Sequence, residues 1–573
     1  MGLIDTSLQI GRSALLSHSL AMDVTGNNMA NAATAGYARQ VVDLQSALGV
    51  RTREGAYLGL GVEAERIRRI SDAYLEQRLR DARADAESLK SQDETFQRLE
   101  GIFNELSDTD LSSVMNDFFT AINTLQLNPE ERSVRRSVVE SAKTFTDTIR
   151  TLREKIDELR SNVNSEIEGA VDTINSITSQ IADMNVEIAK LESGGAKAGA
   201  ATALRDRREV LLGQLADLLQ VRAVELDNGM VNVFAGSDPL VMDRSSYELK
   251  TETRLDRGLL VSDVVFASDS RALTTKGGKV EGLLEARDTG LVEFIDSLDA
   301  WTGAFIDGFN RIHAGGQGLD LYTDVAGARG VTDPAASLAA AGLDFTPATG
   351  TFDIKVKNAT SGETKTFRFH VDLDGLGGDD TTLADLVADI NAQIGASYPQ
   401  VAASVGAGNT LRISSSSADV SFGFSNDTSG VLACLGVNTF FTGKDSTDIA
   451  LSSVIDDNPG LIAASTTGMP GDNSNAANLL AFQRQSLDVL GGESVDSYYQ
   501  GIVSTMGIRA AASSDRSVGS QAILASIQSQ RETLSGVSLD EEAVNLVRYQ
   551  SGYTAAARFV STIDEMIQTL LDM

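Results

Sequence analysis

Cysteine and histidine are scarce in this sequence of 573 residues, and their scarcity excludes several kinds of site. The single cysteine, Cys434, can form no disulfide within the chain and no cysteine-based metal cluster. No two of the three histidines, His18, His313 and His370, fall within one helical turn of each other. The sequence therefore gives little support for a zinc site built from histidines or for a nucleophile paired with a histidine base.

The sequence also lacks long apolar runs and the common catalytic motifs. No stretch approaches the roughly 18 uninterrupted apolar residues of a membrane-spanning helix. The start of the chain places Asp5 and Arg12 among its apolar residues, so it lacks the apolar segment of a cleaved signal peptide. No Walker-type phosphate loop, GxSxG or HExxH arrangement is present. We therefore expect no cofactor, no metal and no membrane partner.

Positively charged residues are far fewer than negatively charged ones. The chain holds 48 Lys and Arg against 80 Asp and Glu, a formal net charge of −32. The acidic residues are spread along the chain, which favours a solvated surface over a binding tail. Nucleic-acid phosphates and anionic lipid surfaces are unfavourable partners for such a protein.

Two groups of acidic residues are candidate sites of chemistry. The loop VDLDGLGGDD at residues 371–380 could gather oxygens around a calcium ion, but it lacks the ligand spacing and distal glutamate of an EF-hand. We interpret it as a solvated hairpin turn and keep calcium binding as the alternative.

Glu541 and Glu542 could serve acid–base catalysis. They follow SGVSLD, where acidic residues cap and complement the start of a helix, and we prefer that interpretation.

Both ends of the chain carry helical apolar patterns. The C-terminal pattern, here called the terminal seam, steps by three and four residues through Leu546, Tyr549, Tyr553, Ala556, Val560, Ile563, Ile567 and Leu570. A terminal helix with such a seam needs a partner. The N-terminus offers a rougher pattern of Ile4, Leu8, Leu15, Met22 and Met29, interrupted at Gly11, His18 and Thr25. We expect the first and last helices to pair.

Between the ends, helical and extended patterns alternate. Helical spacing covers residues 72–96, 134–191, 200–220, 280–314 and 474 to the end. As one helix, the run at 134–191 would be about 87 Å long. Short β-like runs fill 41–70 and 221–275, the latter with an Asn228-Gly229 hairpin turn. From 345 to 450 the chain is rich in Gly, Ser, Thr and β-branched residues, with one short helix.

This order predicts an α+β multidomain fold with three parts. Residues 1–50 and 530–573 form a terminal α-helical coiled-coil domain. Residues 51–344 and 451–529 form a long-helix bundle domain with β-rich inserts at 51–70 and 221–275. Residues 345–450 form a β-rich outer domain. Because the chain goes out and returns through helices, both termini should lie together.

The stretch NNMANAATAGYARQ at residues 27–40 resembles the signature of the flagellar rod, hook and hook-associated axial proteins. The matching positions include Asn27, Asn28, Asn31, Thr34, Gly36 and Tyr37. Residues 535–571 resemble the C-terminal element of the same family, with Gln550, Tyr553, Ala556 and Asp564 in family positions. Rod proteins are much shorter, and hook proteins turn to β structure soon after the motif. The long helices, together with residues 277–316 and 435–443, resemble the family's hook–filament junction proteins.

The resemblance implies a structural, non-enzymatic protein that assembles at the hook tip and connects the hook to the filament. It further implies paired terminal helices in an inner tube, and partners that include further copies of the chain, hook protein, a second junction protein and an export chaperone. The protein would be extracellular in the bacterial flagellum, exported by the flagellar type III route and needed for motility. The alternatives are a hook-type axial polymer subunit, or a secreted enzyme that uses the loop carboxylates Asp372, Asp374, Asp379 and Asp380.

The residues of the motif suggest how it would work. Asparagine forms hydrogen bonds to nearby backbone, and Gly36 allows a tight turn at φ > 0. We therefore expect the segment to end the first helix, and its small residues to let neighbouring subunits approach closely.

Overall fold

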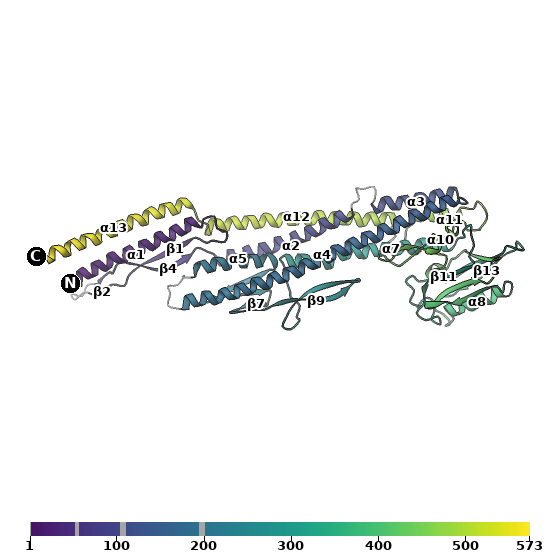
Figure 1. Ribbon diagram of the computed structural model, residues 1–573, viewed down its shortest axis with the longest axis horizontal. Coiled ribbons are helices and arrows are strands. Elements are labelled where there is room, and N and C mark those ends of the chain that lie inside the picture. The colour runs from purple at the N-terminus through teal and green to yellow at the C-terminus, as the bar shows by residue number, and fades with distance from the viewer. Residues whose placement is uncertain (1, 52–56, 104–109, 194–200, 573) are drawn as a thin grey trace. The chain divides into compact units, whose positions relative to one another are not determined.

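The structure, a computed structural model, describes residues 2–51, 57–103, 110–193 and 201–572. It divides into two compact units. Unit 1 comprises Met1–Phe96, Ser161–Thr289 and Ala511–Met573, and unit 2 comprises Gln97–Arg160 and Gly290–Ala510. Helices α2 (Ala73–Phe103), α4 (Arg132–Ser193) and α12 (Val495–Ser535) contribute to both units. Long helices beside several small sheets confirm the α+β class (Figure 1).

The long periodic run is a single helix, as its spacing predicts. Helix α4 contains 62 residues and encloses the predicted run at 134–191. Its apolar face is buried at Val138, Phe145, Ile149, Ile156, Val163, Ile174, Ile181 and Ile188. Helix α5 (Thr202–Leu218) follows it, as expected for residues 200–220.

Unit 2 has an aromatic core. Helix α3 (Leu111–Leu127), which our sequence analysis missed, is capped by Asp110, whose side chain accepts a hydrogen bond from the Ser113 N–H at 2.6 Å. It places Phe118 against Phe145 of α4, with 5.6 Å between the ring centroids. Helix α7 (Leu291–Ala314) supplies Trp301, whose indole N–H donates to the Val495 carbonyl at 2.7 Å. Short helices α9 (Val431–Cys434), α10 (Ser453–Asp457) and α11 (Ser474–Phe482) complete this part.

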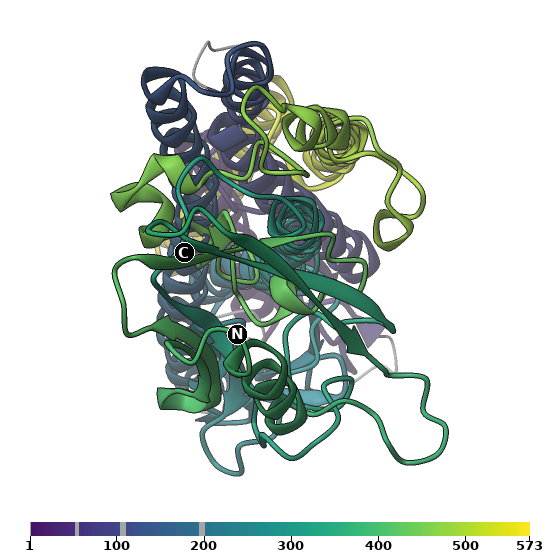
Figure 2. The same ribbon diagram turned by 90° about the vertical axis from the view of Figure 1, so that its right-hand side faces the viewer.

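Two small sheets and a helix occupy the residues expected to be β-rich, except that one strand, Asp324–Gly330, lies within residues that we assigned to the long-helix bundle (Figure 2). One sheet has the order β13-β12-β16 and the other β11-β15-β14. Their strands are β11 (Asp324–Gly330), β12 (Gly350–Asn358), β13 (Thr364–Val371), β14 (Val401–Val405), β15 (Thr410–Ser415) and β16 (Val420–Ser425). The short helix α8 (Leu383–Gly395) begins with a capping box between Thr382 and Asp385. Strands β17 (Phe441–Thr442) and β18 (Ala450–Leu451) pair separately.

Unit 1 contains a four-stranded sheet and a two-stranded ribbon. The sheet is formed by β5 (Val221–Glu225), β6 (Val231–Ala235), β7 (Asp238–Met242) and β8 (Ser245–Ser246). The ribbon is formed by β9 (Leu249–Asp256) and β10 (Leu259–Phe266). The predicted turn at Asn228-Gly229 is present, with a φ of +78° at Gly229.

Asparagines of α4 hold these strands in place. The Asn175 side chain donates to the Leu249 carbonyl and accepts from the Leu249 N–H, both at 2.8 Å. Asn185 does the same for Val231, at 2.8 and 3.0 Å. Such an amide replaces a neighbouring strand, because it satisfies both backbone groups of one residue. We call this pairing an asparagine clamp.

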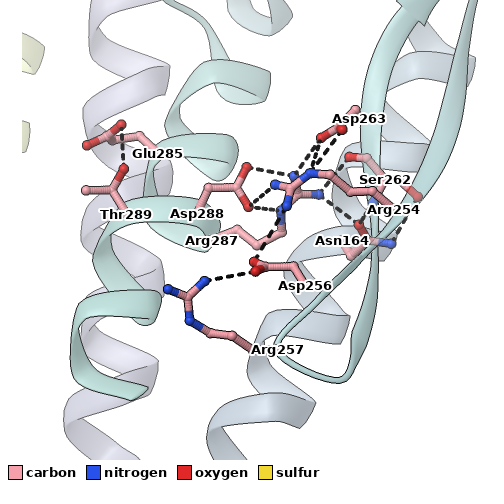
Figure 3. A network of polar contacts seen from close by, with 10 residues as sticks. All are labelled: Asn164, Arg254, Asp256, Arg257, Ser262, Asp263, Glu285, Arg287, Asp288 and Thr289. Carbon is pink, nitrogen blue, oxygen red and sulfur yellow. Dashed lines mark hydrogen bonds and ion pairs between the residues drawn. The ribbon is translucent and has the colours of Figure 1, made fainter. Parts of the chain in front are cut away.

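A buried arginine fixes the ribbon to the helices (Figure 3). The expected helix at 280–314 is interrupted, because a π-helical turn at Ala286–Gly290 separates α6 (Lys279–Glu285) from α7. Arg287, in this turn, donates to the side chain of Asn164 and to the carbonyl of Ser262, both at 2.8 Å. Its other nitrogens donate to Asp288 at 2.9 and 2.8 Å. The network therefore joins α4, β10 and the π-helical turn.

Candidate functional site

The first and last helices pack side by side, as predicted (Figure 1). Helix α1 (Gly2–Ala30) and helix α13 (Leu539–Leu571) run in opposite directions. Gly11 lies against Val560, whereas Asn28 binds Glu542 near the start of α13. This pairing brings the two chain ends together.

The interface between α1 and α13 depends on small residues. A Cβ atom added to Gly11 would overlap the side chain of Val560. A Cβ atom added to Gly552 would lie 2.7 Å from Cε1 of His18. Two of the three positions that interrupt the N-terminal pattern, Gly11 and His18, are therefore contact positions, and the third, Thr25, is buried. The large residues of that pattern, Leu8, Leu15, Met22 and Met29, are only half-buried, and the side chain of Ile4 lies outside the described residues.

The terminal seam is unevenly covered. Ala556 and Ile563 are buried, and Leu546, Tyr549, Val560 and Ile567 are half-buried. Tyr553 is 39% exposed, and the side chain of Leu570 lies outside the described residues. Our sequence analysis missed further exposed apolar residues on α13, here called the outer stripe: Val544, Val547, Phe559 and Met566.

A β-hairpin covers another part of α1. Strands β1 (Gln40–Ser46) and β4 (Val62–Arg69) pair antiparallel, and the short strands β2 (Val50–Arg51) and β3 (Tyr57–Leu58) extend the hairpin. Val42 and Ala64 of the hairpin form a small core with Ala21 and Val24 of α1. The Ser17 hydroxyl donates to the Val62 carbonyl at 3.2 Å.

Asn27, in the last turn of the first helix, and Asn31, just after it, stabilise the turn that follows. Helix α1 ends at Ala30, close to the expected end. The Asn31 side chain donates to the Asn27 carbonyl at 3.0 Å. The Thr34 hydroxyl donates to the Asn31 side chain at 3.2 Å. Asn27, Asn31 and Thr34 therefore satisfy the backbone and one another within the turn, which is the role expected of them.

Asn28 has a different environment, because it is 1% exposed and uses every hydrogen-bonding position of its amide. Its Nδ2 donates to the Gln40 carbonyl at 2.8 Å and to Glu542 at 2.9 Å. Its Oδ1 accepts from the Gln40 N–H at 3.0 Å and from the Tyr37 hydroxyl at 2.8 Å. Asn28 is thus an asparagine clamp on Gln40 that also reaches α13.

The partner of Asn28 on α13 is a buried carboxylate. The Glu542 side chain is 2% exposed, and Arg39 donates to it from Nε at 2.8 Å. Glu541 is 64% exposed and also pairs with Arg39, at 3.2 Å. The Ser538 side chain accepts from the Glu541 N–H. The interpretation of Glu541 as an acidic residue at the start of a capped helix is therefore confirmed. That interpretation is incomplete for Glu542, because its partners lie about 500 residues away along the chain.

Gly36 has the backbone conformation that its sequence context predicts. Its φ is +78°, and a Cβ atom added there would overlap the side chain of Val210. Arg531 of α12 donates to the Gly36 carbonyl at 3.3 Å and to Glu76 of α2 at 3.1 Å. Burial, with smaller contributions from Asp206 and Glu542, raises the pKa of Tyr37 to about 12. The phenol therefore stays protonated and donates to Asn28.

The other candidate groups are engaged in local structure. In the acidic loop, Asp374 accepts from the Leu376 N–H at 2.8 Å and Asp380 from the Gly375 N–H at 3.0 Å. Within the described residues, no cluster of three or more His, Cys, Asp or Glu is arranged to hold a metal ion. Burial raises the pKa of the Cys434 thiol to about 12. Across the described ranges, no helix combines the length and apolar character needed to span a membrane.

Comparison with known proteins identifies relatives along the whole chain. Residues 96–328 match the helical domain of flagellar hook-associated protein FlgK, and residues 528–573 match the C-terminal region of the flagellar basal body rod FlgEFG proteins. Flagellar hook-associated protein 1 of Bacillus subtilis (strain 168) is 25% identical over 577 residues, which cover 99% of this chain and 97% of that protein. The Escherichia coli (strain K12) protein of the same name is 25% identical over 585 residues, covering 98% of each.

A solved structure shows a similar fold. The flagellar hook junction protein FlgK from Burkholderia pseudomallei aligns with a TM-score of 0.53 and 17% sequence identity. The alignment covers 80% of this chain and 100% of that one.

Proposed function

This chain belongs to the FlgK family of flagellar hook-associated proteins, and from that membership we propose that it is the structural junction protein that connects the flagellar hook to the filament. The observation that carries the proposal is the paired arrangement of α1 and α13, with the outer stripe left exposed on α13. A helix that has one partner within the chain and a second apolar stripe facing solvent is suited to bind further subunits.

The distribution of charge supports this role. Helix α1 has three residues with formal charge, Asp5, Arg12 and Asp23, among its 29 residues. Between Glu542 and Asp564, only Arg548 and Arg558 are charged. Depletion of charge is typical of the buried centre of protein interfaces. In a chain of net charge −32, the terminal pair is therefore a surface on which copies can approach without strong repulsion.

The proposed assembly is a ring or helical array of copies. Residues 31–39 between α1 and β1, here called the motif loop, would lie where subunits meet, together with the terminal seam and the outer stripe. The terminal coiled coil would be innermost, the long-helix bundle around it and residues 345–450 outermost. A contact between two different surfaces of one chain generates such closed or helical arrays. Before assembly the uncovered apolar residues have no partner, so we expect the chain ends to be partly disordered, in exchange between paired and free forms.

The remaining parts of the proposal follow from the family. The partners would be further copies of the chain, hook protein, a second junction protein and an export chaperone. The protein would lie outside the cell in the flagellum, after export by the flagellar type III route without a cleaved signal peptide. We propose no catalytic role, since Asp372, Asp374 and Asp380 of the acidic loop accept hydrogen bonds from that loop's own backbone.

Electron microscopy of cells that lack this protein tests the proposal. We expect hooks without filaments, together with flagellin released into the medium. Cells without hooks would instead indicate a hook-type polymer subunit. Normal hooks and filaments would contradict a structural junction role.

A further inference from the structure

Two parts of the chain that are distant in sequence meet at one buried ion pair in unit 1. The carboxylate of Glu542, on α13, has one partner, Asn28, on α1 and another, Arg39, immediately before β1. A buried carboxylate that loses its partner keeps the full cost of its desolvation. Helix α13 therefore cannot bury this face favourably unless Arg39 and Asn28 are already in position.

The position of Asn28 depends in turn on the hairpin. Its amide holds both backbone groups of Gln40, the first residue of β1, and accepts from Tyr37. If the hairpin does not form, the Asn28 amide loses the two hydrogen bonds that hold it to Gln40. The orientation that presents Nδ2 to Glu542 is thus fixed by closure of β1.

The same segment binds the end of α12. The Arg39 N–H donates to the carbonyl of Ser535, the last residue of that helix, at 2.9 Å. Helix α12 and helix α13 are separated by residues 536–538. The segment at 28–40 therefore contacts both sides of this break, and it sets the direction in which α13 leaves α12.

We propose that Asn28, Arg39 and Glu542 form a terminal latch, a conformational device that makes the docking of α13 conditional on closure of the β1–β4 hairpin. The latch is open when either segment is displaced, and it closes when both are in place. It converts two separate packing events into one cooperative step. The chain ends then exist either as two free segments or as one closed pair.

Hydrogen exchange of the full-length chain tests the latch, with the amides of β1 and α13 as the readout. Arg39→Gln leaves Glu542 buried without its cation, and we expect exchange protection in β1 and α13 to fall together, on the order of tenfold or more. Amides of unit 2 report whether the rest of the chain is folded.

The distinguishing measurement is a second substitution in the Arg39→Gln background. Adding Glu542→Gln removes the unpaired buried charge, so it should restore protection in both segments. Adding Glu541→Gln, the matched control at the exposed neighbour, should restore nothing. The proposal is overturned if Glu542→Gln causes a further loss, if both second substitutions act alike, or if α13 loses protection while β1 keeps it.

Discussion

The side-chain amide of Asn28 pairs with both backbone groups of Gln40, donating to its carbonyl at 2.8 Å and accepting from its N–H at 3.0 Å. Asn175, Asn185 and Asn391 form the same clamp on Leu249, Val231 and Ala403. Asparagine suits this pairing because its side-chain amide offers a hydrogen-bond donor and an acceptor side by side. Three of these clamps fix strands of sheets, and the fourth fixes the start of the terminal hairpin.

Asn28→Asp should release the chain ends. The substitution replaces the donor that faces the Gln40 carbonyl and Glu542 with a negatively charged oxygen, and we expect a cost of about 3–5 kcal/mol to terminal packing. Exchange protection of α13 measures the loss. The matched control is Asn27→Asp, which adds the same charge at the exposed neighbour and keeps the acceptor for Asn31. Equal effects of the two variants would refute the role given to Asn28.

Gly36→Val should disturb the motif loop far more than Ala35→Ser. Valine at a φ of +78° is strained by about 1–3 kcal/mol, and its side chain would also overlap Val210. Ala35 is exposed and tolerates a hydroxyl. Swimming of cells that produce each variant is the measurement. Equal motility of both variants would show that the turn geometry is unimportant.

Two charge substitutions on α13 separate packing within the chain from assembly between chains. Ile563 is buried on the terminal seam, so Ile563→Asp should undock α13, leave unit 2 folded and abolish incorporation at the hook tip. Met566 is 58% exposed on the outer stripe, so Met566→Asp should leave the exchange protection of α13 unchanged and still prevent incorporation. Normal filament growth with either variant would count against the assembly surface.

Unit 2 should lose stability as the pH falls, through His313. Its Nδ1–H donates to the Asn438 carbonyl at 2.8 Å, and its Nε2 accepts the Ala463 N–H at 3.0 Å, so the buried ring is neutral. Burial lowers its pKa from 6.5 to about 4. Between these values the unfolded chain binds more protons than the folded one. Stability is therefore full above pH 6.5 and declines by about 3 kcal/mol as the pH falls toward 4.

Fluorescence of Trp301, the single tryptophan, follows unfolding of this unit. Urea unfolding at pH 7.5 and at pH 5 gives the free energy of unfolding at each pH. This free energy should fall more for the original chain than for His313→Asn, whose side chain retains a donor near the Asn438 carbonyl but does not titrate. Parallel pH dependence in the two proteins would exclude His313 as the cause.

The long helices could be predicted because their apolar spacing repeats over many turns. Helix α4 is the clearest case, since its buried residues keep the spacing from Val138 to Ile188. Helix α3 could have been predicted in the same way, because Asp110 precedes apolar residues at helical spacing. Our prediction without this helix is wrong. The turn at Gly36 could also be predicted, since glycine after small polar residues is typical of a positive φ.

The contacts between the chain ends could not be predicted from local pattern. Gly11 and Gly552 interrupt an apolar pattern, and only the neighbouring helix reveals that their lack of a side chain makes room for Val560 and His18. A glutamate followed by a helix is usually a solvated cap. Burial of Glu542 depends on Arg39 and Asn28, which adjoin it only after the termini meet.

Cryo-electron microscopy of the isolated hook–filament junction tests the central claim most directly. Our account predicts density for this chain between the last hook subunits and the first filament subunits, with α1 and α13 paired on the inner wall and the outer stripe against a neighbouring copy. A junction in which this chain is absent, or in which the outer stripe faces solvent, would contradict it.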